Sequence, residues 1–232
     1  MAVGNFYLVT SLPSLGELGT PPPLAPADLM GHVEGSSAAD AVAAVLLADD
    51  LIQREAYLAG ETDQVEPAVL SPAQAQDEEP LPASLAPEPD AAAARQGPAS
   101  DAIWEAYFRH AAAAARRSGS AFLRAWVGFE VALRNALATA RAKALDLDPD
   151  TYLVTPDLAD ADTDVSPLVS EWSDAANPLE GLRALDRGRW AWLHEHDAHF
   201  SFQDDELAAY AAKLVLVARW HRLEQAERSP QQ

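Results

Sequence analysis

The densest group of side chains that could do chemistry is a run of three histidines and two carboxylates near the C-terminus. His194, His196 and His199 alternate with Glu195 and Asp197, and imidazole and carboxylate groups are common ligands of Zn²⁺. A helical zinc site of the metalloprotease type needs two histidines four residues apart with a glutamate between them. That spacing is absent here, and polar residues are ordinary at a helix end. We therefore predict no metal site, and a metal-bound or proton-linked role is the alternative.

A second candidate is the pair Glu130 and Arg134, four residues apart in an aromatic segment, with Asn135 beside it. A carboxylate among aromatic side chains can have a raised pKa and act as a general acid. No second catalytic group accompanies it, and no Ser/His/Asp set or nucleotide-binding loop can be assembled by motif. We interpret Glu130 and Arg134 as a stabilising i, i+4 ion pair, and Asn135 as a residue that caps or bridges helices. The sequence predicts no catalytic residue, no cofactor and no enzyme.

Composition excludes several classes of function. The chain has 232 residues, a net charge of −20, a pI near 4.4 and no cysteine. Such a surface repels nucleic acid and anionic lipid. The missing cysteines exclude disulfides and thiolate sites. No apolar run is long enough to span a membrane, and no export signal is evident. We expect a cytoplasmic protein with no bound nucleic acid and no direct membrane insertion.

The charge is unevenly distributed along the chain. Residues 1–100 carry a net charge of −13 and residues 146–207 carry −13 as well, whereas residues 101–145 carry +4 and residues 208–232 carry +2. The two basic segments are also the most helical ones. This pattern indicates that they attract either the acidic segments or an acidic partner.

The N-terminal segment 5–12 is apolar and aromatic and ends at Pro13. It is too short and too polar to cross a membrane, so it has to be buried. Its residue types favour a strand, but the start of a buried helix fits equally. We expect it to pack against the helices predicted over residues 120–145 or 203–226. An exposed segment would instead indicate a docking element.

The remaining elements that position these residues are helices. Helical spacing predicts helices over residues 101–117 and 120–145, another from residue 177 to about 196, and a last one from about residue 203. In the strongest, one apolar stripe is formed by Phe122, Trp126, Phe129, Leu133 and Leu137. The fold class is therefore all-α, a helical bundle with the short apolar N-terminal segment packed on it.

The predicted domain organisation has three parts. Residues 1–60 form the N-terminal segment and a helical hairpin, with Ser36 and Ser37 capping the longer helix. Residues 61–100 are rich in Pro, Ala and acidic side chains, which predicts a disordered linker, with a partly ordered arm as the alternative. Residues 101–232 form a helical core that packs with residues 1–60 as one domain.

Two tryptophans near the C-terminus suggest a contact surface. Trp190 and Trp192 are two residues apart, so on one helix they point in different directions. One of them is expected at a surface that contacts a protein partner.

Several segments together resemble an uncharacterised bacterial family whose members are typically encoded among the genes of V/A-type ATP synthases. The N-terminal part of the resemblance is Phe6-Tyr7-Leu8-Val9-Thr10-Ser11-Leu12-Pro13 followed by Pro21-Pro22-Pro23. The C-terminal part comprises Trp126, Phe129, Glu130, Leu133, Arg134 and Asn135, then Asn177-Pro178-Leu179-Glu180, Leu185-Asp186, Arg189-Trp190 and Leu193, and finally Phe202, Leu207, Tyr210, Leu214 and Trp220. It covers roughly residues 5–30 and 100–225.

The resemblance implies a role by position among the genes. Members of this family occur where the socket subunit of the ATPase is expected, an all-helical protein that joins the central stalk to the membrane ring. The resemblance thus implies a fold like that of the socket subunit. It also implies a non-catalytic accessory or central-stalk role, peripheral to the inner membrane through the ATPase. The partners would be the central stalk and membrane ring. A soluble assembly factor or regulator that binds the ATPase transiently is the alternative.

Overall fold

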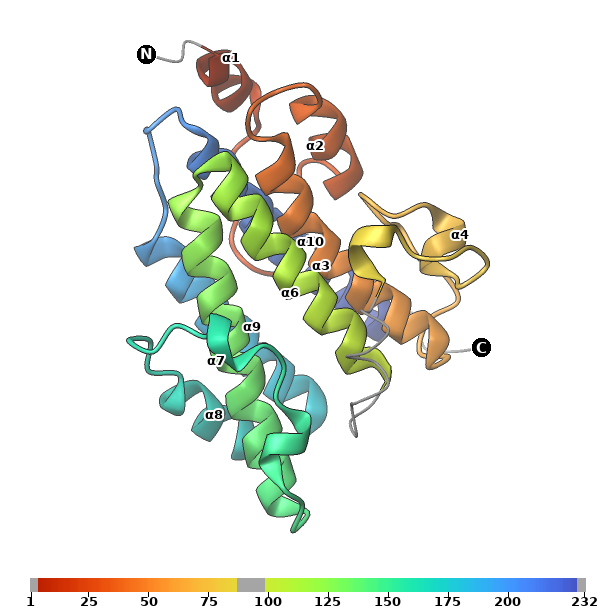
Figure 1. Ribbon diagram of the computed structural model, residues 1–232. Coiled ribbons are helices and arrows are strands. Elements are labelled where there is room, and N and C mark those ends of the chain that lie inside the picture. Colours follow the sequence, from red (N-terminus) through yellow and green to blue (C-terminus); the bar gives the residue numbers. More distant parts are fainter. Residues whose placement is uncertain (1–3, 87–98, 229–232) are drawn as a thin grey trace. The chain divides into compact units, whose positions relative to one another are not determined.

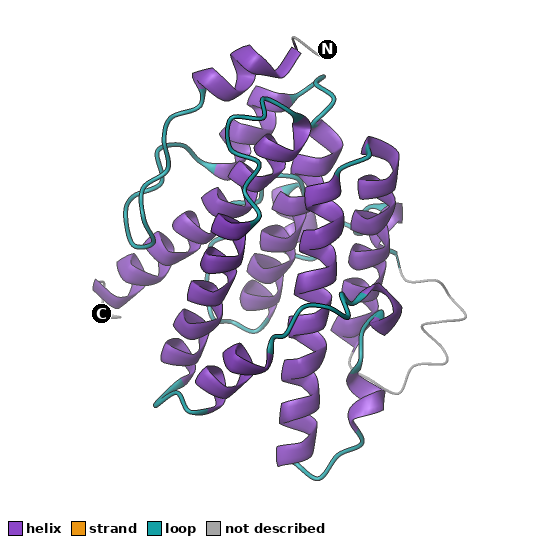
Figure 2. Ribbon diagram, turned by 90° about the vertical axis from the view of Figure 1, so that its left-hand side faces the viewer, coloured by secondary structure: helices purple, strands orange, loops and turns teal. Residues whose placement is uncertain are grey.

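The computed structural model describes residues 4–86 and 99–228, and these residues form helices and no strand (Figures 1 and 2). The predicted all-α class is confirmed. The chain divides into two compact units, one made of residues 1–81 and 193–232 and the other of residues 82–192. This division differs from the predicted single domain, because the two ends of the chain pack together and leave the middle to form a core of its own.

The first unit is built on two long helices, α3 (Ala39–Leu58) and α10 (Asp204–Arg228), which pack against each other. Helix α2 (Pro26–Val33) contacts both of them. Nearly every residue of α10 from Glu206 to Ala218 is buried. A helix that is apolar around most of its circumference belongs in the interior of a protein, which explains its central position.

The N-terminal segment is helix α1 (Gly4–Ser11), so the strand alternative is wrong. It packs against α10, as one of the two expected positions required. Asn5 donates a hydrogen bond to Asp204, the ring centroid of Phe6 lies 5.1 Å from that of Phe202, and the hydroxyl of Tyr210 donates to the carbonyl oxygen of Pro13 at 2.8 Å.

The predicted linker is ordered over its first part. Residues 61–81 lie against α3 and include the short helix α4 (Pro72–Ala75). The buried carboxylate of Asp50 accepts hydrogen bonds from the backbone N–H groups of Ala68, Val69 and Leu70 at 2.7–2.8 Å. Composition misled the prediction here, because one buried side chain holds three backbone donors. Residues 87–98 of the predicted linker lie outside the described residues.

The second unit is organised around helix α7 (Ala121–Ala144). It contacts α6 (Ala99–Ser118), α8 (Ser166–Ser173) and the 3₁₀ turns η2 (Pro149–Tyr152) and η3 (Pro156–Leu158). Turn η1 (Ala83–Leu85) contacts α6, and α9 (Pro178–Glu195) contributes most of its residues to this unit.

Local sequence explains the boundaries of α6 and α7. Gly119 adopts a φ of +69° between them, a conformation that glycine reaches without steric cost. The hydroxyl of Ser120 then accepts a hydrogen bond from the N–H of Leu123 at 2.9 Å and caps α7. Ser36 and Ser37 do not cap α3 as predicted, because its N-cap residue is Ala38. Ser37 bonds Asp204 at the start of α10 instead, at 2.7 Å.

Among the described residues, no helix is both long enough and apolar enough to cross a membrane.

Candidate functional site

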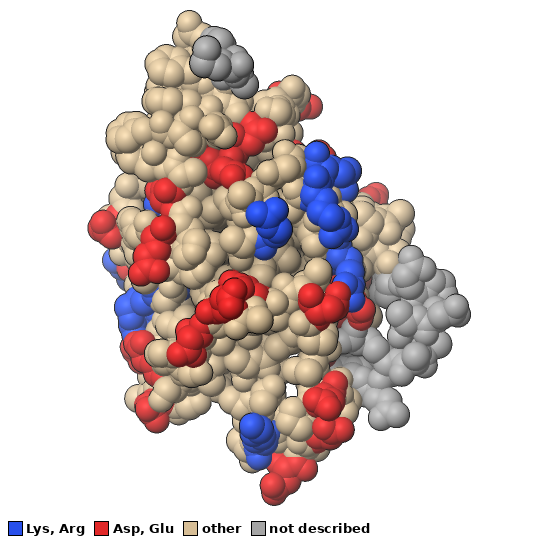
Figure 3. Space-filling view, turned by 60° about the vertical axis from the view of Figure 1, so that its left-hand side comes forward, with Lys and Arg blue, Asp and Glu red and all other residues tan. Residues whose placement is uncertain are grey.

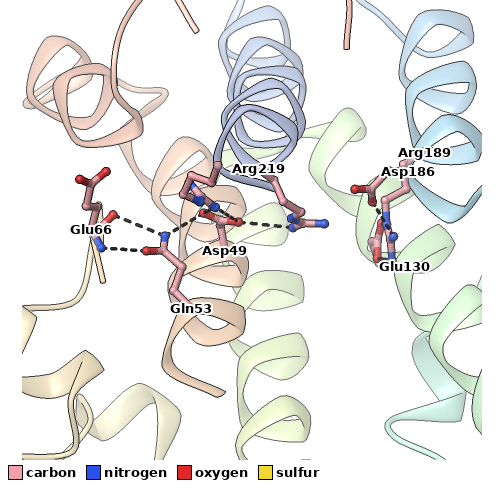
Figure 4. A network of polar contacts seen from close by, with 8 residues as sticks. Asp49, Gln53, Glu66, Glu130, Asp186, Arg189 and Arg219 are labelled. Atoms are coloured by element: carbon pink, nitrogen blue, oxygen red, sulfur yellow. Dashed lines mark hydrogen bonds and ion pairs between the residues drawn. The ribbon is translucent and has the colours of Figure 1, made fainter. Parts of the chain in front are cut away.

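The strongest candidate in the second unit is a buried cluster of one arginine and two carboxylates (Figure 4). On α9, the guanidinium of Arg189 donates to Glu130 of α7 through Nε at 2.7 Å and through Nη2 at 3.1 Å. Its Nη1 donates to Asp186, one turn earlier on α9, at 3.0 Å. The Asp186 side chain is 0% exposed, that of Arg189 16% and that of Glu130 20%. A bidentate pair of this kind ties two helices together with a defined geometry.

Electrostatics keep this cluster ionised. Burial lowers the pKa of Arg189, but Glu130 and Asp186 outweigh burial, so its pKa lies above the ordinary value. Burial, with Glu130 as a further cause, also raises the pKa of the neighbouring Tyr107 hydroxyl. A carboxylate held by two guanidinium hydrogen bonds is a poor proton donor. The cluster therefore suits positioning of helices better than acid–base chemistry.

The predicted pair of Glu130 with Arg134 is wrong, because each residue faces a different neighbour. Arg134 donates to Asp101 of α6 at 3.2 Å, and its guanidinium carbon lies 4.6 Å from the ring centroid of Trp104. The i, i+4 spacing was correct as a helix pattern. Contacts with α6 and α9, which are not encoded in that spacing, decided the partners.

Asn135 bridges elements, which confirms one part of its prediction. Its amide nitrogen donates to the carbonyl oxygen of Val154 at 2.9 Å, and its amide oxygen accepts from the N–H of Val154 at 2.8 Å. The bond ties α7 to the segment after η2 where both side chain and backbone are buried. The pair satisfies a donor and an acceptor of the same residue, which a buried loop requires.

The predicted aromatic residues of the C-terminal half belong mainly to the core of this unit. The ring of Trp192 lies 5.0 Å from Phe129 and 5.3 Å from Trp126, measured between centroids. Trp126 is 7% exposed and Trp192 is 8% exposed. Trp190 is half-buried. The two tryptophans of α9 therefore differ in environment, as their spacing predicted, but Trp192 is a packing residue.

The first unit holds a buried cluster of opposite composition, with one carboxylate and two arginines (Figure 4). Asp49 of α3 is 2% exposed. It accepts from Arg222 of α10 at 2.8 and 3.1 Å and from Arg219 at 3.4 Å. Gln53 donates to Asp49 at 2.9 Å, and its amide oxygen accepts from the N–H of Glu66 at 2.8 Å. The cluster joins α3, α10 and the segment after α3.

This cluster did not emerge from the sequence as a site. Asp49 occupies a position on the apolar face of a predicted helix, and a charged residue at such a position was the available signal. Its partners are about 170 residues away in the chain. Spacing rules within one helix cannot find a partner at that distance.

The predicted N-terminal residues lie at the surface of the first unit. Tyr7 is 75% exposed, Leu8 and Leu12 are half-buried, and Pro13 is exposed. The segment is thus packed on α10 by one side and open on the other. It combines the two outcomes that the sequence left open.

The histidine run does not assemble a ligand set. His194, His196 and His199 have exposed side chains. Within residues 4–86 and 99–228, no group of three or more His, Asp or Glu side chains is placed to hold a metal ion. The nearest approach is His199 Nδ1 to the Glu206 carboxylate, at 3.8 Å.

Fold and clusters together define a strongly acidic helical protein whose buried charged groups join helices. Residues 98–229 match the family described as "Protein of unknown function (DUF2764)". The match spans more than half of the chain, so the chain belongs to this family. No curated protein and no solved structure matches it. The matched region includes the Arg189 cluster and the arginines of the Asp49 cluster.

Proposed function

We propose that this protein is a non-catalytic, protein-binding subunit that works by shape and charge. The observation that carries the proposal is the use made of its buried ionisable groups. Arg189 with its carboxylates and Asp49 with its arginines both clamp helices. Groups spent on rigid positioning suit a scaffold that has to keep its surface in one arrangement.

The distribution of charge supports a cationic partner. The basic segments pair with acidic ones inside each unit, as with Arg109 and Asp157 at 2.8 Å and with Arg222 and Asp49. Pairing of this kind uses up many of the 16 Lys and Arg side chains, whereas the chain has 36 Asp and Glu. Carboxylates are accordingly spread over the face in Figure 3. Such a surface steers basic surfaces toward it.

The proposed complex is a bacterial V/A-type ATPase, in which the chain would serve as an accessory or central-stalk component between the rotor stalk and the membrane ring. This part of the proposal rests on the resemblance over residues 5–30 and 100–225. The all-helical architecture of the described residues agrees with a protein like the socket subunit.

The test is purification of the ATPase from its native membranes, followed by quantitative mass spectrometry against isotope-labelled peptides of this chain. We expect a fixed ratio of the chain to the rotor subunits. A mock purification from cells whose ATPase carries no affinity tag is the control. Absence from an otherwise complete complex would overturn the proposal. Recovery only with incomplete complexes would favour the alternative, a transient assembly factor or regulator.

A further inference from the structure

The first unit exposes a cluster of aromatic side chains where α1 meets the turn before α10. Phe200 is 71% exposed, Tyr7 75% and Phe6 47%. The rings form a connected group, with centroids 5.7 Å apart for Phe6 and Tyr7, 5.1 Å for Phe6 and Phe202, and 6.4 Å for Phe200 and Phe202. Contiguous exposed apolar side chains of this kind mark interaction sites more often than scattered ones do. We call these four residues the aromatic cluster.

The backbone under this cluster is held in a conformation that its residue types disfavour. Phe200 has a φ of +60° and Phe202 a φ of +53°. For a bulky residue, each such conformation costs on the order of 1–3 kcal/mol. Glycine or asparagine would form the same turn at lower cost. The turn alone therefore does not explain why phenylalanine occupies both positions.

A single buried carboxylate stabilises the turn. Glu206, which is 7% exposed, accepts from the N–H of Phe200 at 3.0 Å and from the N–H of Phe202 at 2.7 Å. The Phe200 side chain remains largely in water although its backbone is held in place. This combination presents an aromatic ring in a fixed position, which reduces the entropy lost on binding.

Charge around the cluster identifies the partner's chemistry. Helix α1 has no charged residue over Gly4–Ser11, whereas α10 begins with Asp204, Asp205 and Glu206. Among the described contacts, Asp204 bonds the uncharged Asn5 and Ser37. Glu206 bonds backbone groups and Ser201, and approaches His199. Within the described part of the chain, neither Asp204 nor Glu206 is matched by Lys or Arg. The helix dipole offsets only about half a charge, so the rim of the cluster is negative.

We propose that the aromatic cluster is a docking site for a cationic amphipathic segment of another protein, with apolar side chains against the rings and Lys or Arg toward Asp204 and its neighbours. A second copy of this chain is disfavoured as the occupant, because it brings the same carboxylates and a net charge of −20. The inference concerns the chemistry of the partner and stands whether or not that partner belongs to an ATPase.

The test is fluorescence anisotropy of the full chain with two labelled helical peptides of about 18 residues, long enough to be helical in water. Both carry leucine on one face, and the other face carries lysine in one peptide and glutamate in the other. We expect the lysine peptide to bind at least about tenfold more tightly and to weaken as NaCl is raised. Equal binding of the two peptides, or no binding of either, would overturn the proposal.

Variants separate this site from general attraction to an acidic protein. Phe200→Asn keeps a residue that tolerates a positive φ and removes the ring, and Tyr7→Ser truncates a ring that is mostly in water. Each is expected to lower the affinity for the lysine peptide at least about fivefold, as loss of an aromatic anchor does. Leu145→Asn, at a residue 68% exposed in the second unit, is the matched control and should leave it unchanged.

Two further outcomes contradict the proposal. One is equal loss of affinity in the Leu145→Asn control and the cluster variants, because binding would then not be local. The other is self-association of the wild-type chain in sedimentation velocity that Phe200→Asn abolishes, because the occupant would then be a second copy.

Discussion

The buried clusters of the two units are near inversions of each other. In the first unit one carboxylate, Asp49, lies between Arg219 and Arg222, whereas in the second unit one guanidinium, Arg189, lies between Glu130 and Asp186. Each cluster joins two helices. The summed charge of the three side chains is positive in the first cluster and negative in the second. The difference matters because carboxylates can be neutralised by protons within the working range of pH, whereas arginine cannot.

The largest expected effect comes from Arg189→Met, which removes the guanidinium that lies between Glu130 and the fully buried Asp186. Loss of one partner of a buried ion pair typically destabilises a protein by about 3–5 kcal/mol. We expect a loss of about 4 kcal/mol in the free energy of unfolding at pH 7, measured by urea denaturation.

Acid should partly rescue this variant. Two buried carboxylates that have lost this cation have raised pKa values in the folded state, so the folded state takes up protons before the unfolded chain does. The loss relative to wild type should shrink as the pH falls from about 7 toward about 5. A loss that stays constant with pH would contradict the assignment of the charges.

Asp49→Asn is expected to cost less, about 3 kcal/mol, because the arginines that it leaves reach solvent. The side chain of Arg222 is 34% exposed and that of Arg219 13% exposed, so water screens part of the uncompensated charge. The urea midpoint should fall at pH 7 and show no recovery in acid. Recovery equal to that of Arg189→Met would remove the distinction between the two clusters.

Asp50, the neighbour of Asp49, provides a pH effect within the first unit. Burial is the main cause that raises its pKa to about 6 from an ordinary value of 3.8, against the opposing effect of three backbone hydrogen bonds. The folded state therefore binds this proton more tightly than the unfolded chain. The stability contributed by this group rises as the pH falls from about 7 to about 4, by at most about 3 kcal/mol.

The check is a comparison of the wild type with Asp50→Asn, whose side chain does not titrate. The difference between their unfolding free energies should change with pH over that interval, and Asp28→Asn on α2 is a control on an exposed carboxylate of the same unit. A difference that is flat with pH would show that Asp50 does not titrate there.

The smallest effect is expected at the surface pair of Arg109 and Asp157. Their side chains are 48% and 57% exposed. The hydrogen bond from Arg109 lowers the pKa of Asp157 below its ordinary value. Asp157→Asn should change the free energy of unfolding by less than about 1 kcal/mol and less still in high salt. A loss comparable to that of Arg189→Met would mean that burial does not govern these pairs.

Local pattern was sufficient for the helices and insufficient for their partners. The stripe from Phe122 to Leu137 predicted α7 to within a residue or two of Ala121–Ala144, and the acidic turn at Asp204 predicted the start of α10. Glu130 was recognised as a notable residue, yet its partner Arg189 is 59 residues away. The segment after α3 looked like a linker because the residue that orders it, Asp50, lies outside it.

The sequence by itself determined the all-helical fold class, the positions of the long helices and the excess of negative charge, because these depend on residue types and on spacing within one element. Tertiary structure alone decided which carboxylate meets which arginine, that the chain forms two compact units, and that aromatic rings gather where α1 meets the turn before α10. Those contacts join residues up to 199 positions apart. Their formation depends on how the chain returns on itself, which no local periodicity encodes.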